Sequence, residues 1–303
     1  MIVKDSTIEA LRKQFVKLFQ KGLGSAPQEW KRLATRIPSG GAENTYGWLG
    51  KFPQMREWVG DRVLKSMAEH AYSLANKKFE STVDVDRADI EDDNLGMYSP
   101  IVESVGEEAM NHIDRNIYAL LTGGFSALCY DGQNFFDTDH PVNAEVDGSG
   151  SDTETANILN PATTTEPAWF LLHTKKPVKP LIFQERTKAE FETITDPKQD
   201  TVFMKDKYLY GVRARRAFGY GFWQMAVAAR DTLNETNFNA AMQMMMEFQA
   251  DGGDPLNLTP DLLVVPPSLR AVANELILAQ YKADGASNPN YKAVDVLVTS
   301  WLA

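Results

Sequence analysis

This 303-residue sequence has few residues that bind transition metals or act as thiol nucleophiles: it contains one cysteine, Cys129, and four histidines. A single cysteine cannot close an intrachain disulfide, and it has no second thiol with which to bind a metal. A lone buried cysteine is usually structural, and no histidine stands beside Cys129 in sequence as a general base would. The sequence therefore indicates a reducing compartment and argues against a cysteine nucleophile.

Long apolar runs and export signals are also missing. A helix that crosses a bilayer needs about 18 consecutive apolar residues, and no such run occurs. Asp5, Glu9, Arg12 and Lys13 interrupt the N-terminus before any apolar segment of signal-peptide length. We therefore expect a soluble chain that is made in the cytoplasm and has no membrane partner.

Nucleotide-binding motifs and an excess of basic charge are absent as well. Gly219-Tyr220-Gly221 lacks the third glycine of a dinucleotide fingerprint, and no GxxxxGK[ST] loop occurs. The 31 basic and 41 acidic residues give a formal net charge of −10. Because tight nucleic-acid binding needs a net basic footprint, the whole chain is not expected to bind DNA tightly or in a sequence-specific way.

The sequence does contain enough apolar residues for a packed core, at 43% of the chain. Its length predicts one large or two modest domains. The spacing of apolar residues predicts helices over 6–21, 99–122, 237–250 and 268–281, and strands over 83–86, 169–172, 181–183, 191–195, 208–212, 262–265 and 294–302. Helices and strands mix without a regular βαβ alternation, which indicates the α+β class.

The helix predicted over 6–21 has two interpretations, and two further segments are predicted to lack regular structure. The helix over 6–21 carries Arg12, Lys13, Lys17 and Lys21 on its polar side. It is either an arm that docks on an acidic partner or membrane surface, or an ordinary packed helix with its lysines in solvent. Residues 22–50 are rich in turn-forming residues and predict an extended or loosely structured arm, and residues 137–167 predict a long exposed loop.

Candidate chemical sites are few. Asp137, Asp139 and His140 could begin a metal site, but no second histidine lies three or four residues away, so a turn before Pro141 is favoured. The acidic run over 84–93 lacks the glycine and glutamate of a calcium loop and indicates a solvated strand edge.

Two groups of residues are candidates for contacts between subunits. Arg213, Arg215 and Arg216 form a compact basic cluster, for which ion pairing within or between subunits is favoured over nucleic-acid contact. Residues 45–62 are rich in aromatic residues and also contain glycines and a proline, which interrupt regular structure. Trp48, Phe52 and Trp58 in this segment are either anchors on a neighbouring subunit or part of the chain's own core.

Eight segments, in order along the chain, resemble the pattern of Mu-like phage and prophage major head subunits. The first reads ENTYGWLGKFPQMREWVGDR and the fourth reads FFDTDHPV. Several are long and unusual, so the resemblance is specific, and it extends over nearly the whole chain except residues 143–167. The segments are residues 43–62, 87–93, 124–132, 135–142, 179–186, 219–226, 263–269 and 301–302.

This resemblance implies a major capsid protein with the α+β fold of the Hong Kong 97 type. Such a fold would divide the chain into five parts. These are an N-terminal arm (1–44), an extended loop (45–83), a peripheral domain with a long spine helix (84–124), an axial domain (125–290) and a closing strand that returns to the peripheral domain (291–303).

The function implied by the resemblance is self-assembly, through hexamers and pentamers, into an icosahedral shell that encloses double-stranded DNA. Further expected partners are a scaffold protein, the portal and other head proteins, and the expected locations are the virion capsid and, during assembly, the bacterial host cytoplasm. Such a protein is not an enzyme, and no catalytic residue, cofactor or metal is expected. The alternatives are another phage structural part, such as a tail tube or connector protein, and a metal-dependent hydrolase built on Asp137, Asp139 and His140.

Overall fold

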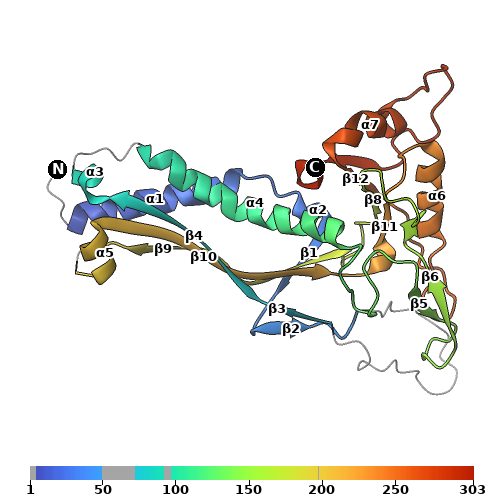
Figure 1. The fold of residues 1–303 in the computed structure, drawn as a ribbon, viewed down its shortest axis with the longest axis horizontal. Helices are drawn as coiled ribbons and strands as arrows, with labels where there is room; N and C mark the ends of the chain where they lie inside the picture. The colour runs from blue at the N-terminus through green and yellow to red at the C-terminus, as the bar shows by residue number, and fades with distance from the viewer. Residues whose placement is uncertain (1–4, 50–71, 92–96, 197) are drawn as a thin grey trace.

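The protein consists of an elongated lobe that joins a broader lobe at one end (Figure 1). The computed structural model describes residues 5–49, 72–91, 97–196 and 198–303. Helices and strands mix in both lobes without a regular βαβ alternation, which confirms the predicted α+β class. In the described part of the chain, no helix is both long enough and apolar enough to span a membrane.

A four-stranded sheet runs along the elongated lobe in the order β1-β9-β10-β4. Its two central strands are long and antiparallel, β1 pairs in parallel with β9, and β4 pairs antiparallel with β10. The acidic residues Asp84 and Asp86 therefore lie on an edge strand, as predicted, where charges discourage pairing with another sheet. The strands are β1 (Ala34–Pro38), β4 (Lys77–Asp86), β9 (Leu181–Ile194) and β10 (Lys207–Tyr220).

Two helices lie together over one face of this sheet, α1 (Asp5–Ser25) and α4 (Ser99–Gly123). The bounds of α4 confirm the predicted long helix. The two helices cross where glycines let the backbones touch: a Cβ on Gly106 would lie 2.3 Å from the carbonyl oxygen of Phe19, and one on Gly22 would lie 2.0 Å from that of Glu103. Any side chain at these positions would force the helices apart.

The apolar face of α1 packs on its own chain. Phe15 and Phe19 are fully buried, with ring centroids 4.8 Å from Tyr210 and 5.3 Å from Phe191, both on the sheet. The basic side of the helix is exposed to solvent. In this structure, therefore, α1 is the packed helix of the simpler interpretation rather than a free docking arm.

Residues 22–49 are more ordered than predicted. They contain α2 (Trp30–Leu33), β1 and β2 (Glu43–Thr45), and β2 pairs with β3 (Ser73–Ala75). The Trp30 ring is buried 4.9 Å from the ring of Phe183, and the backbone N–H of Trp30 donates to the Asp114 carboxylate at 2.7 Å. These long-range contacts fix a segment whose own residues favour turns.

The broader lobe is built on a five-stranded sheet in the order β13-β12-β8-β11-β7. Strands β8, β11 and β12 are buried on both faces, which agrees with their unbroken apolar sequences. The strands are β7 (Ile158–Leu159), β8 (Trp169–Leu172), β11 (Ala226–Ala229), β12 (Leu262–Val265) and β13 (Asp295–Val298).

Helices and turns complete both lobes. The broader lobe holds α6 (Glu235–Met246), α7 (Arg270–Leu278) and a hairpin of β5 (His140–Asn143) and β6 (Asp152–Thr155), so residues 137–167 are not one open loop. The outer end of the elongated lobe holds α3 (Arg87–Glu91) and α5 (Asp200–Lys205). The short 3-10 turns are Trp223–Met225, Pro267–Leu269 and Ser300–Leu302.

Two segments belong to a different lobe from the one that the expected five-part division assigns to them. Residues 181–220, expected in the axial domain, form β9 and β10 beside α4, because β10 pairs with β4. The closing strand β13 pairs with the buried strand β12 in the broader lobe and does not return to the sheet beneath α4. The turn after it, Ser300–Leu302, does contact α4. The remaining boundaries stay predictions.

Candidate functional site

Of the three aromatic contact candidates, the structure describes only Trp48. Its ring is half-buried and lies 5.9 Å from both Tyr46 and Phe222, so it packs on its own chain. Phe52 and Trp58 lie outside the described residues. The contacts of Trp48 favour a structural role within the subunit and leave part of its surface open to a neighbour.

Arg216 lies inside its own subunit. It is 3% exposed, and its guanidinium donates to the carbonyl oxygen of Ala109 on α4 at 3.1 Å. Burial lowers the pKa of Arg216 from its ordinary value. The hypothesis that Arg216 contacts another subunit does not fit this structure, because side chains alternate faces along β10 and Arg216 lies on the face covered by α4.

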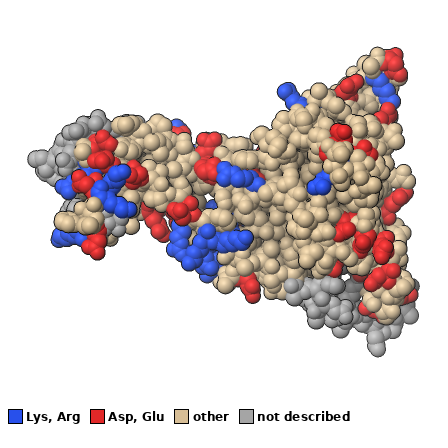
Figure 2. All heavy atoms as spheres, in the orientation of Figure 1, with Lys and Arg blue, Asp and Glu red and all other residues tan. Residues whose placement is uncertain are grey.

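Arg213 remains on the open face of the sheet. It is exposed and lies in register between Glu80 on β4 and Glu190 on β9, which allows ion pairing within the sheet. Arg215 is half-buried. Figure 2 shows that Lys and Arg groups lie beside Asp and Glu groups over the elongated lobe, whereas the visible face of the broader lobe is mostly uncharged with scattered acidic groups.

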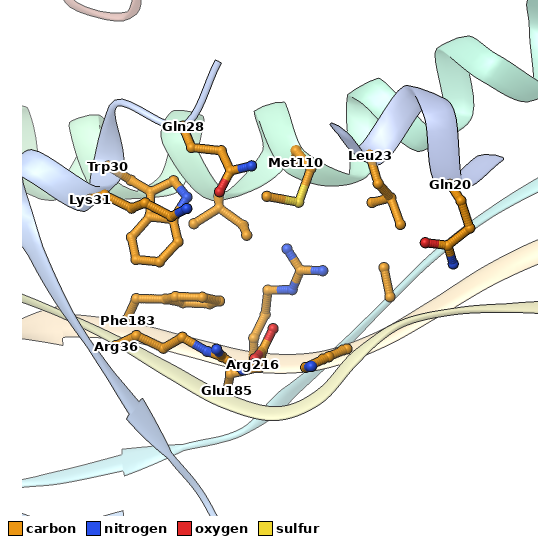
Figure 3. Close-up of a pocket in the computed structure, with 13 residues that line it drawn as sticks. Gln20, Leu23, Gln28, Trp30, Lys31, Arg36, Met110, Phe183, Glu185 and Arg216 are labelled. Carbon is orange, nitrogen blue, oxygen red and sulfur yellow. Dashed lines mark hydrogen bonds and ion pairs between the residues drawn. The ribbon is translucent and has the colours of Figure 1, made fainter. Parts of the chain in front are cut away.

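A cavity of about 360 Å³ lies between α1, α2, α4 and the two central strands (Figure 3). Arg216 points into it from the sheet, and Arg36 pairs with Glu185 at its rim. The described lining residues include no serine, cysteine or histidine. They therefore provide no serine or cysteine nucleophile with a histidine base. The lining residues are Gln20, Leu23, Gln28, Trp30, Lys31, Arg36, Met110, Ile113, Phe183, Glu185, Lys188, Ala189 and Arg216.

The side chains of Asp137, Asp139 and His140, the set considered for a hydrolase, do not converge on one site. Asp137 accepts hydrogen bonds from the backbone and side-chain nitrogens of Asn134, at 3.1 and 2.9 Å, and Asp139 is exposed and accepts from Thr138. His140 points the other way, into the protein, and is fully buried. The geometry does not support a metal-dependent hydrolase on these three residues.

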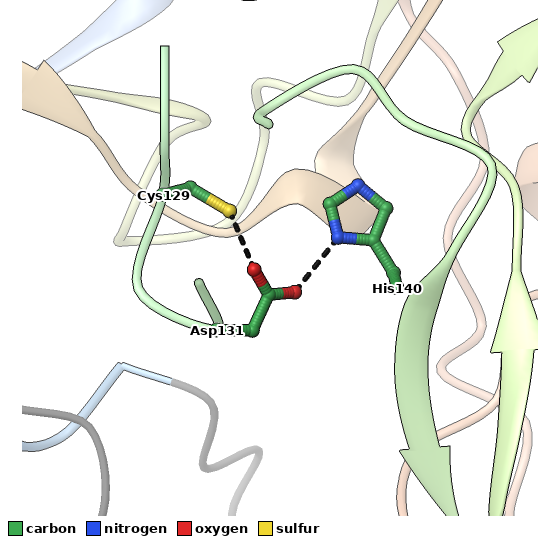
Figure 4. A group of neighbouring side chains, drawn as sticks. All are labelled: Cys129, Asp131 and His140. Atoms are coloured by element: carbon green, nitrogen blue, oxygen red, sulfur yellow. Dashed lines mark hydrogen bonds and ion pairs between the residues drawn. The ribbon is translucent and has the colours of Figure 1, made fainter. Parts of the chain in front are cut away.

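His140 instead meets Cys129 and Asp131, which are presented by a tight turn after α4 (Figure 4). Gly132 closes that turn with a φ of +86°, a conformation that favours glycine. Asp131 accepts from the Cys129 Sγ at 2.9 Å through one oxygen and lies 2.7 Å from the His140 Nδ1 through the other. His140 also stacks on Trp223, with centroids 4.0 Å apart.

Burial and neighbouring polar groups shift the pKa values of Asp131 and Cys129 in this cluster. Burial would raise the pKa of Asp131, but hydrogen bonds from His140 and Cys129 outweigh it and lower the pKa. Burial and the neighbouring carboxylate raise the pKa of the Cys129 thiol well above its ordinary value. A thiol held in its protonated form is a poor nucleophile, so the cluster is not a catalytic triad.

The sequence contained a weak signal for this cluster. Cys129 and Asp131 stand two residues apart before a glycine, a spacing typical of a tight turn. Sequence spacing groups His140 with its neighbours Asp137 and Asp139. Nothing in the local spacing indicates that β5 turns His140 back toward the earlier turn.

Comparison with known proteins gives full-length matches. A family model described as Mu-like prophage major head subunit gpT matches residues 8–302. The major capsid protein of Escherichia phage Mu is 45% identical over 305 residues, covering all of both chains. The Mu-like prophage FluMu major head subunit of Haemophilus influenzae is 43% identical, covering 95% of this chain and 94% of that protein.

Solved capsid structures agree with the sequence matches. A chain in the procapsid of bacteriophage JBD30 is 50% identical with a TM-score of 0.89, covering 99% of this chain and 100% of that one. A chain in the JBD30 capsid is 38% identical with a TM-score of 0.78, covering 100% of both. The fold is therefore the α+β phage-capsid fold of the Hong Kong 97 type, and the chain belongs to the family of Mu-like prophage major head subunits.

Proposed function

We propose that this chain is the major capsid protein of a Mu-like phage or prophage and assembles with copies of itself, as hexamers and pentamers, into an icosahedral head. The observation that carries this proposal is the match over the whole length of both chains to a major capsid protein and to a procapsid chain. The family is structural, so the chain is not an enzyme. A tail tube or connector function is not favoured by these relatives.

The proposal extends to partners and location. A scaffold protein, the portal and other head proteins would contact the shell, which forms in the bacterial cytoplasm and becomes the virion capsid. The shell would enclose double-stranded DNA without reading its sequence. The net charge of −10 supports this, because a lining that repels phosphate lets the genome pack without adhering.

Exposed apolar side chains at the ends of both lobes support contacts between copies. Phe203 and Met204 on α5 are each 78% exposed at the outer end of the elongated lobe. Leu278 at the end of α7 and Tyr281 just beyond it are 49% and 60% exposed in the broader lobe. Apolar groups in such positions are typical of interaction surfaces. Trp48, Arg213 and Arg215 remain further proposed contacts.

The test is assembly of the purified protein, followed by negative-stain microscopy and sedimentation. Closed particles or capsomers support the proposal, whereas rods, or a small soluble oligomer under all conditions, contradict it. Phe203→Ser with Met204→Ser should reduce particle yield and leave subunit unfolding unchanged, because both side chains are exposed. Lys205→Ala is the matched control on α5, since it removes no apolar contact surface, and it should assemble normally.

A further inference from the structure

The buried cluster of Cys129, Asp131 and His140 brings together three kinds of metal ligand. One ligand atom of each residue lies within 4.8 Å of the others. The Cys129 residue is 5% exposed and His140 is fully buried. The geometry points to a binding site for one zinc-type divalent cation, in which three protein ligands tie the turn after α4 to the first strand of the β5–β6 hairpin and the fourth tetrahedral position is left to a non-protein ligand.

Asn157 fixes the orientation of the imidazole. Its side-chain nitrogen faces the carbonyl oxygens of Phe135 and Ala226, at 2.8 and 3.2 Å, so its side-chain oxygen faces the His140 Nε2 at 3.3 Å. The Nε2 therefore carries a proton. A ligating histidine usually donates its other N–H to such an oxygen, which leaves the Nδ1 to face the metal.

A proton or a metal ion must lie between Asp131 and each of its two neighbours. With Nε2 protonated, a neutral imidazole would direct the lone pair of Nδ1 at a carboxylate oxygen only 2.7 Å away. The Cys129 Sγ is likewise 2.9 Å from the second carboxylate oxygen. Each of these contacts is stable with a proton between the atoms, or with one metal ion shared by all three ligands.

The buried charge is the same in both cases. With protons, the cluster consists of a thiol, an imidazolium and a carboxylate, and its net charge is zero. With a divalent ion, it consists of a thiolate, a neutral imidazole, a carboxylate and the cation, and its net charge is again zero. One cation therefore replaces two protons without adding a charge to the interior, which is the largest cost of burying an ion.

The ligand set selects the class of ion. Thiolate and imidazole ligands suit zinc and related transition metals, whereas calcium and magnesium prefer oxygen ligands. Zinc binds sulfur at about 2.3 Å and nitrogen at about 2.0–2.1 Å, so the Asp131 carboxylate, now 2.9 and 2.7 Å from the Cys129 and His140 atoms, would have to move away from each by less than about 1 Å to admit it. The stacked Trp223 ring keeps the imidazole in its plane during such a change.

The experiment measures metal in the full-length chain from cells grown with added zinc, by elemental analysis after removal of loosely bound ions. We expect about one zinc ion per chain. Cys129→Ser keeps a hydroxyl donor for Asp131 but no thiolate, and it should lose the bound zinc. Asp139→Asn is the matched control, because Asp139 is exposed outside the cluster, and it should retain the zinc.

A second measurement needs no variant. Wild-type chain refolded with cobalt should show the charge-transfer absorption of a cobalt–thiolate bond. Wild-type protein without zinc and without that absorption would overturn the proposal, as would full zinc retention in Cys129→Ser. Zinc loss in Asp139→Asn but not in Cys129→Ser would assign the metal to other ligands and would also overturn it.

Discussion

The crossing of α1 and α4 makes Gly106→Ala the most direct test of the packed N-terminal helix. The new Cβ would lie 2.3 Å from the carbonyl oxygen of Phe19, where ordinary contact begins near 3.4 Å. The helices must therefore separate by about 1 Å, because the obstacle is backbone and cannot rotate away. Overpacking of this kind typically costs about 1–3 kcal/mol, which outweighs the gain of up to about 1 kcal/mol from alanine in a helix.

The assay is thermal unfolding of isolated subunits, together with limited proteolysis of residues 5–25. We expect Gly106→Ala to lower the unfolding temperature by several degrees and to make α1 easier to cleave. Gly24→Ala on α1 is the control, because a Cβ there would meet nothing within 4 Å, and it should be neutral or stabilising. If the two variants unfold and are cleaved alike, the close crossing of the helices is refuted.

Three further predictions follow from buried groups. Burial raises the pKa of Asp114 from 3.8 to about 6, so the folded chain binds a proton more tightly than the unfolded chain and loses stability as the pH rises through 6. Asp114→Asn should therefore unfold at a higher temperature than wild type at pH 8 but not at pH 4, and an equal shift at both would contradict this. Burial lowers the pKa of His112 from 6.5 to about 4, so the protein should lose stability as the pH drops from 6.5 to 4. His112→Gln should weaken this pH dependence of the unfolding temperature, and an unchanged pH profile in the variant would contradict the prediction. Trp48→Ala should destabilise the isolated subunit by about 2 kcal/mol, since half of a large ring leaves its packing, whereas unchanged unfolding with lost particles would make Trp48 an intersubunit anchor.

The elements that could be predicted from the sequence are those whose pattern is local. Helix α4 has an apolar face of regular period and ends in two glycines, and strands β8 and β12 are short apolar runs. The sequence predicts two strands where β9 is one, because β9 begins fully buried and then alternates between half-buried and exposed residues. Strand β1 was missed, since its pairing with β9 depends on residues far along the chain.

The contacts of the candidate sites were harder to predict for the same reason. Alternation along β10 places Arg216 and Arg213 on opposite faces of the sheet, but which of the two faces α4 covers is set by packing between segments far apart in the chain. His140 stands beside Asp139 in sequence but meets Asp131 in space. Sequence spacing cannot predict the direction of the His140 side chain, because His140 packs on Trp223, which is far away in the chain.

The pairing order of the elongated lobe has a consequence for how the protein folds during synthesis. Strand β4 ends at residue 86, but its partner β10 is complete only at residue 220. At ribosomal rates of about 5–20 residues per second, β4 waits roughly seven to twenty-seven seconds for that partner. The crossing of α1 and α4 can form in the meantime, because both helices precede residue 124. For a chain made in many copies, that interval is when unpaired edges on neighbouring nascent chains could join incorrectly.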